Sequence, residues 1–286
     1  MTSSIGTFRG QCSAALRWSW PGRLLVFVLA ATSIWCLLFE MYALCSMRTF
    51  FLAILLPATA ALYGLAFFDH IRGDRRLAQA IIIGTAAGLA GAVAYDIFRL
   101  PFVFSDAWGL GRVGIPQMPL FKVFPRFGAM ILGQPLEQGV PAGQPGNAWG
   151  KGYSTAAHLL GWLYHFSNGA TFGVMFAMLF GGVAVNPEQA DSRLDGNSDA
   201  HRARVRRPLR ARGGIMLRAV AMAVGIEICL LISPYAKFFN IHVTPRFVVV
   251  TLMAHVVFGL GLGAWFALHA ARHQRRAPLR AESRLA

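Results

Sequence analysis

The chain has 286 residues, of which 56% are hydrophobic and only 14% are charged, and its formal net charge is +15 at pH 7. Soluble domains carry about 25% charged residues, so this composition excludes an ordinary soluble protein and predicts an all-α, polytopic membrane helix bundle. The positive charge does not indicate nucleic-acid binding, because the basic residues lie mainly between and beyond the apolar segments.

Six apolar segments are long enough to cross a bilayer, which takes about 20 residues. In chain order they are 22–44, 49–68, 77–99, 154–182, 214–234 and 247–270. The first is longer than the apolar core of a signal peptide, so we expect it to remain as a span. Only Cys45–Arg48 separates the first two, which therefore form a tight helical hairpin. We expect 1–286 to form a single membrane domain.

The basic residues predict the orientation of these six spans. If the N-terminus is inside, 19 of the 27 basic residues fall in inner segments and 8 in outer segments. Because basic residues are retained on the cytoplasmic side, both termini are predicted to be cytoplasmic, in a bacterial inner (plasma) membrane.

Two connecting loops are long. The inner loop, 183–213, has an acidic, polar first half and an Arg-rich second half. We expect this second half and the Arg-rich C-terminus to contact anionic lipid headgroups. The outer loop, 100–153, is rich in Gly and Pro but also contains the apolar run MPLFKVFPRFGAMIL. It is expected to lie on the outer surface of the bundle or to dip into it, as a lid or as a plug.

Three spans carry pairs of glycines spaced four residues apart: Gly84 and Gly88, Gly169 and Gly173, Gly259 and Gly263. Glycines at this spacing let helix backbones approach closely in a membrane, where lipid gives no hydrophobic drive for helix association. The third, fourth and sixth spans are therefore predicted to form the tight centre of the bundle.

Polar side chains interrupt the apolar segments in one part of the bilayer. An ionised group at bilayer depth costs about 2.5–3.5 kcal/mol on insertion scales, so such groups usually mark a functional site. The candidates are Glu40, Asp96, Arg99, His158, His165, Asn168, Glu227 and His255. At about 1.5 Å of rise per residue, all of them fall in the outer half of the bilayer or near its midplane.

The helical phase suggests how these groups combine. His158 and His165 share a helix face but differ by about 10 Å in height, so they cannot bind one metal ion together. A single site for zinc or iron would combine His165, His255 and Glu227 from three helices. His158 with Asp96 would form a separate layer nearer the outer surface.

Purely structural roles are open for the same residues. Asp96 and Arg99, three residues apart, can form a salt bridge at a helix end. Glu40 can extend to the headgroups. Glu227 and His255 can simply pair with each other.

Three functions remain open. The first, which the buried acid and His groups favour, is transport or proton and ion translocation. The second is a metal-dependent membrane enzyme that acts on a lipid. Haem is a further cofactor option, since His255 and His269 are spaced to ligate one haem each. The third is a non-catalytic subunit or assembly factor, in a homo-oligomer or a larger membrane complex.

Overall fold

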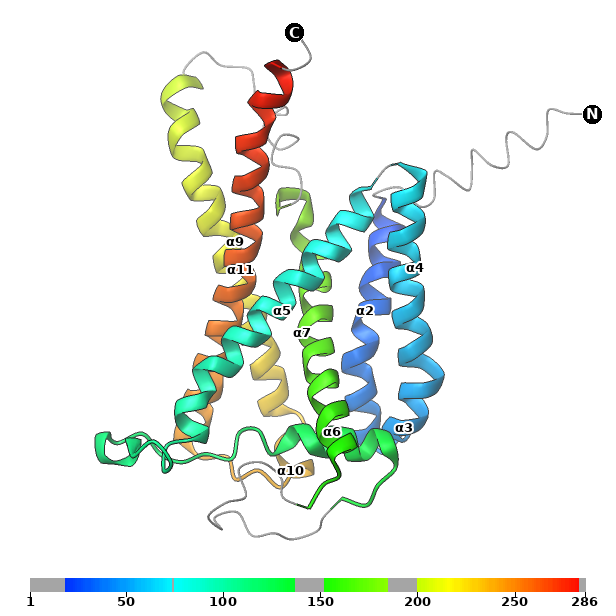
Figure 1. The fold of residues 1–286 in the computed structure, drawn as a ribbon, viewed down its shortest axis with the longest axis vertical. Helices are drawn as coiled ribbons and strands as arrows, with labels where there is room; N and C mark the ends of the chain where they lie inside the picture. The colour runs from blue at the N-terminus through cyan, green and yellow to red at the C-terminus, as the bar shows by residue number, and fades with distance from the viewer. Residues whose placement is uncertain (1–18, 74, 137–151, 185–199, 283–286) are drawn as a thin grey trace, which may run out of the picture.

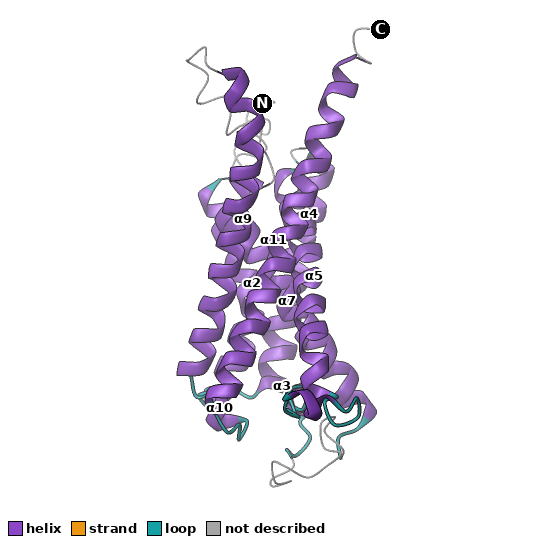
Figure 2. Ribbon diagram, turned by 90° about the vertical axis from the view of Figure 1, so that its left-hand side faces the viewer, coloured by secondary structure: helices purple, strands orange, loops and turns teal. Residues whose placement is uncertain are grey.

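The computed structural model describes residues 19–73, 75–136, 152–184 and 200–282, and only the backbone of 181–184, 200–212 and 272–282. Over these residues every regular element is a helix and none is a strand. The long helices alternate in direction and form an elongated bundle (Figures 1 and 2). The first described helix begins, and the last one ends, at the same end of this bundle (Figure 1).

The long helices are α2 (Trp20–Met41), α4 (Leu56–Arg72), α5 (Arg76–Val103), α7 (Thr155–Ala184), α9 (Ala200–Ile232) and α11 (Pro245–Glu282). The short elements are α3 (Met47–Phe50), the π-helical turn η1 (Phe51–Leu55), the 3₁₀ helix η2 (Leu110–Val113), α6 (Val123–Leu132) and α10 (Tyr235–Phe238). These short elements lie at the end of the bundle that the basic residues predict to be outside (Figure 1). We call this end the outer end.

Five helices are long and apolar enough to cross a membrane: α2, α3 to α4 as one unit, α5, the 213–232 part of α9 and the 245–271 part of α11. The chain is therefore a multi-pass membrane protein by helix length and hydropathy. The fourth predicted span, 154–182, corresponds to α7, which is not among these five. α7 carries His158, His165 and Asn168, and its role as a span stays a prediction.

Two helices extend beyond the predicted spans. α9 begins at Ala200 instead of 214, and α11 continues to Glu282 instead of 270. Arginine is a good helix former, and a helix that has already nucleated propagates at little cost. The Arg-rich half of the predicted inner loop is therefore largely helical, whereas 185–199 lies outside the described residues.

The helices are arranged as an open curve in which each packs on the next: α2 on α7, α7 on α5, α5 on α11 and α11 on α9. α4 packs on the outside of α2 and α5, and α6 packs on α7. α9 touches α7 only slightly, and among the described residues no substantial packing joins α9 to α2. The curve therefore has a gap between its two ends.

The predicted glycine faces are confirmed at the helix crossings. A Cβ atom on Gly88 would overlap the carbonyl oxygen of Gly169, and one on Gly84 would meet the backbone at Gly173. Gly259 lies equally close to the backbone of α9 at Val220. At each of these positions a side chain would push the two helices apart.

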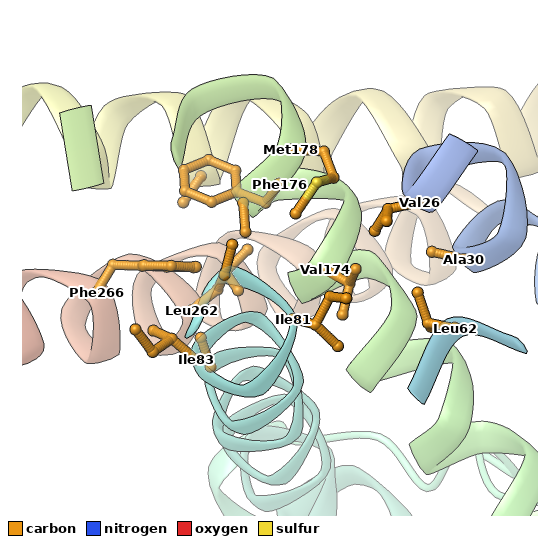
Figure 3. Packing of buried hydrophobic residues seen from close by; sticks show 14 of the residues in the cluster. Val26, Ala30, Leu62, Ile81, Ile83, Val174, Phe176, Met178, Leu262 and Phe266 are labelled. Atoms are coloured by element: carbon orange, nitrogen blue, oxygen red, sulfur yellow. The ribbon is translucent and has the colours of Figure 1, made fainter. Parts of the chain in front are cut away.

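The buried apolar side chains form two clusters. The inner cluster joins α2, α4, α5, α7, α9 and α11, and includes Leu62, Ile81, Val174 and Leu262. Figure 3 shows these side chains pointing toward one another between the helices. The outer cluster joins the outer ends of α2 and α7 to α3, α6 and Phe239, the residue after α10. A large cavity lies beside this outer cluster.

Candidate functional site

The cavity has a volume of about 960 Å³ and is lined by α2, α5, α6, α7, α9, α10 and α11. Most of its wall is apolar, with side chains such as Leu37, Phe172, Ile226 and Phe247. One side is polar and combines α5, α7, α9 and α11. Five of the eight polar residues predicted as site candidates line the cavity: Arg99, His165, Asn168, Glu227 and His255. A sixth, Asp96, is bonded to His165.

The first polar group of this wall is built on Asp96. Its Oδ2 atom lies 2.9 Å from Nε2 of His165, and its Oδ1 atom lies 3.7 Å from Nη1 of Arg99. The predicted Asp96–Arg99 ion pair is therefore present, but it is part of a larger group with His165. Asp96 and Arg99 are only 8% and 5% exposed, so the two charges compensate each other away from water.

Aromatic rings fix the position of this group. The guanidinium carbon of Arg99 lies 4.7 Å from the ring centre of Tyr95 and 5.1 Å from that of Phe121. The imidazole of His165 stacks on Phe124 of α6, with ring centres 4.2 Å apart. Arg99 also donates through Nη2 to the carbonyl oxygen of Leu120. The segment just before α6 and α6 itself therefore hold the outer side of the site.

The second polar group pairs α9 with α11. Oε2 of Glu227 lies 3.2 Å from Nδ1 of His255, and the same nitrogen lies 3.0 Å from the carbonyl oxygen of Thr251. Both neighbours accept hydrogen bonds when Glu227 is ionised, so Nδ1 carries the proton. In a neutral His255 the other ring nitrogen, Nε2, is then an acceptor.

Tyr95 lies between the two groups. Its ring centre is 6.0 Å from that of His165 and 5.0 Å from that of His255. Two His–carboxylate pairs from four helices therefore share one wall, with a phenol between them.

The predicted three-residue metal site does not form. Among the described residues no three His, Cys, Asp or Glu side chains are grouped so that they could hold a metal ion. Glu227 pairs with His255, whereas His165 pairs with Asp96. The reason is that the ring of Tyr95, on α5, separates the two pairs.

The predicted layer of His158 and Asp96 is wrong, because Asp96 pairs with His165. α5 continues to Val103, one turn further than predicted, and it crosses the bundle obliquely while α7 is nearly upright (Figure 1). The extra turn places Asp96 further from the outer end of α5 than the prediction assumed. His158 is not a cavity residue.

Glu40 also lies away from the cavity. Its Oε2 atom accepts a hydrogen bond from the backbone N–H of Met47, the first residue of α3. Glu40 thus satisfies a free donor at the start of a helix and closes the turn between α2 and α3. This contact replaces the predicted extension to lipid headgroups.

Three buried polar atoms of the described residues have no hydrogen-bond partner, and all three belong to this wall. They are Oδ1 of Asp96, Nε of Arg99 and Oδ1 of Asn168. An unpaired buried polar group costs about 1–3 kcal/mol, and such groups in a native protein call for an explanation in function. The polar wall therefore lacks hydrogen bonds that a bound molecule could supply.

Aromatic residues also close the inner side of the cavity. Phe172 of α7 and Phe258 of α11 both line it, with ring centres 6.2 Å apart. Further inward, Phe176 and Phe266 are fully buried and lie 5.3 Å apart. The cavity therefore ends at a packed floor.

The outer side is bridged by α6 and the segment after α10. Nη1 of Arg126 donates to the carbonyl oxygen of Phe239, and Phe127 packs edge-on against the ring of Phe239. Burial raises the pKa of the nearby Tyr235 phenol, so it remains protonated at neutral pH. Asp106, Gln117, Asn240 and His242 also line the cavity. All four side chains are exposed. This rim therefore reaches the outer surface.

Sequence reasoning missed Tyr95, Phe124 and Gly225. Tyr95 directly precedes Asp96, and this position was the available signal. Gly225 lines the cavity, and a Cβ atom placed on it would meet nothing within 4 Å. No other glycine lies four residues from Gly225, so the glycine spacing could not identify it.

Comparison of the chain with protein-family models, curated proteins and solved structures gives no match. The site itself therefore has to support any inference about function.

Proposed function

We propose that this protein binds a small apolar or amphiphilic solute in the cavity of its outer half, that binding is linked to a proton, and that this is one step of transport. The observation that supports the proposal most directly is the shared wall. Two His–carboxylate pairs, Asp96–His165 and Glu227–His255, face one cavity of about 960 Å³. This volume is within the range of small-molecule sites.

The charges of the wall favour linkage to one proton. Asp96 and Glu227 are acidic, Arg99 is basic, and the neighbouring phenols Tyr95 and Tyr235 are neutral. With both histidines neutral, the wall has one net negative charge. A proton taken up by the Glu227–His255 pair brings it to zero. An uncharged solute that displaces water favours the neutral wall. Binding should therefore strengthen as the pH falls.

The floor is consistent with an outward-facing state of a transporter. Such proteins bind near the membrane midplane and open to one side at a time. Here the cavity reaches the rim at Asp106 and Asn240 and ends at Phe172 and Phe258. Transport would require these inner contacts to separate.

The first test measures binding. N-phenyl-1-naphthylamine, an uncharged probe that fluoresces in apolar sites, is titrated into nanodiscs containing the purified protein, with empty nanodiscs as background. Saturable binding is expected, and Gly225→Phe should weaken it at least tenfold by filling the cavity. Gly64→Phe is the matched control, since Gly64 also has open space at its Cβ position but is not a cavity residue. Equal binding by the two variants would refute the proposal.

The second test measures the proton. In proteoliposomes that contain pyranine, with the outside acidic, the probe should cause additional proton entry in the wild type and in Gly64→Phe. No additional entry is expected for Gly225→Phe. Saturable binding without proton entry would contradict transport and indicate a protein that only binds the solute. Absence of both binding and proton entry would indicate that the polar wall has only a structural role.

A further inference from the structure

The curve of helices that surrounds the cavity is not closed. α9 packs on α11 and only touches α7, and no substantial packing joins α9 to α2 over the part of the chain that the structure describes. Nevertheless, α2 and α9 line the same cavity, through Ile34, Leu37 and Leu38 on one side and Ile226, Leu230 and Leu231 on the other. We call these six residues the portal. The portal lies at the depth of the apolar spans and is entirely apolar.

We infer that the portal opens the cavity sideways into the lipid, and that the ligand is a membrane-dissolved amphiphile with an uncharged, hydrogen-bonding head group. This inference rests on the proposed function, since it names the class of solute that the cavity binds. The chain of such a molecule would pass between α2 and α9, and its head would meet the polar wall.

The apolar character and position of the portal favour a chain from the bilayer over a solute from water. Five of its six residues are partly exposed and one, Leu37, is buried. Beyond them, Trp35 and Ile228 of the same helices are about half exposed on the lipid-facing surface. A polar solute would gain nothing along this path, whereas an alkyl chain would exchange one apolar environment for another.

The polar wall favours an uncharged head group. Each carboxylate already has a partner. Asp96 pairs with Arg99 and His165, and Glu227 pairs with His255. An anionic head would add to the net negative charge of this buried wall, and an ammonium head has no acceptor for the unpaired donor on Arg99. The three atoms without hydrogen-bond partners are two acceptors, Oδ1 of Asp96 and Oδ1 of Asn168, and one donor, Nε of Arg99. A head group that both donates and accepts, such as a hydroxyl, matches this set.

The basic rim residues do not contradict an uncharged head. Arg126 is engaged with Phe239 and with the hydroxyl of Tyr153, and Asp106 lies on the same rim. The rim therefore contains both signs of charge.

The experiment uses a monoacylglycerol with a diazirine in its chain, incorporated into proteoliposomes of the full chain. After irradiation, mass spectrometry locates the labelled peptides. Label is expected on both 34–38 and 226–231. Leu230→Trp, which narrows the portal, should reduce the label on 34–38 at least threefold. Ile228→Trp is the matched control on the same helix, since Ile228 is 48% exposed and is not a cavity residue.

The alternatives have distinct outcomes. Label spread over all lipid-facing peptides, with Leu230→Trp equal to Ile228→Trp, would overturn the portal. A short-chain monoacylglycerol from the aqueous phase that prevents labelling as well as the long-chain compound would place the entrance at the rim, and would overturn it too. In either case, pH-dependent binding of N-phenyl-1-naphthylamine that still depends on Gly225 would leave the proposed function intact.

A second part of the experiment tests the charge of the head group. A fatty acid with the same diazirine chain, fully ionised at pH 8, should label 226–231 at least fivefold less than the monoacylglycerol does. Equal or stronger labelling by the fatty acid would overturn the assignment of an uncharged head group.

Discussion

The inner half of the bundle is tightly packed, whereas the outer half, built from the same helices, encloses a cavity. In the inner half, glycines bring α5 and α7 into backbone contact, and rings such as Phe176 and Phe266 fill the remaining space. In the outer half the same helices separate around a cavity of about 960 Å³ with acids and histidines in its wall. Helices that cross obliquely and in close contact at one depth of the bundle diverge at another depth, and this divergence leaves room for the cavity.

The two halves also use polar groups differently. Near the inner end, the buried Asp69 accepts a hydrogen bond of 2.9 Å from the backbone N–H of Ala78, at the start of α5. Its role is explained by helix capping. The polar atoms on Asp96, Arg99 and Asn168 have no such partner. Unpaired groups confined to one cavity are what distinguishes a site from a structural polar contact.

The largest effect is expected where the inner half is tightest. Gly88→Leu would force α5 and α7 apart, because Gly88 is in contact with the backbone of Gly169. We expect a loss of about 3 kcal/mol or more in the free energy of unfolding, seen as little folded protein after size-exclusion chromatography. Gly64→Leu should behave as the wild type, and a folded, stable Gly88→Leu protein would contradict the packing described for the inner half.

The next effect concerns the buried charge in the outer half. Asp96→Ala leaves Arg99 without its acidic partner, which should cost about 3 kcal/mol, since breaking a buried ion pair strands a charge. The measurement is thermal unfolding in detergent. Combining Asp96→Ala with Arg99→Met should recover much of the loss, and a double variant less stable than Asp96→Ala alone would argue against this ion pair.

A smaller effect is expected on binding rather than on stability. Glu227→Gln removes one negative charge, so the wall is neutral without a proton. Binding of N-phenyl-1-naphthylamine at pH 8 should then approach the wild-type affinity at pH 5, and its dependence on pH should largely disappear. Fluorescence titrations between pH 5 and pH 8 measure the affinity for the probe. A variant that keeps the wild-type pH profile would place the titrating group elsewhere.

The smallest effect is expected at Glu40, which lies in the outer half but away from the cavity. Glu40→Ala removes the hydrogen bond to the N–H of Met47 and should cost about 1 kcal/mol. Glu40→Gln keeps an acceptor and should cost less. Neither should alter probe binding, which separates a turn-closing acid from the acids of the cavity.

The sequence alone determined the class of protein, the positions of the helices and the glycines at their crossings. Hydrophobic runs must be helical in lipid, since every backbone group has to be paired within the segment. Glycine spacing is a property of a single helix face, and so it could be read without a partner helix. The same reasoning identified six of the residues in or against the cavity wall.

Only the tertiary structure decided how these residues combine. Counting residues along upright helices placed Asp96 beside His158 and joined His165 to Glu227 and His255. The oblique course and extra turn of α5 bring Asp96 to His165, and Tyr95 holds the two pairs apart. Helical phase and depth follow from local geometry, but the lateral distance between two helices depends on where they cross and at what tilt. Those are set by contacts between distant segments, which no local pattern contains.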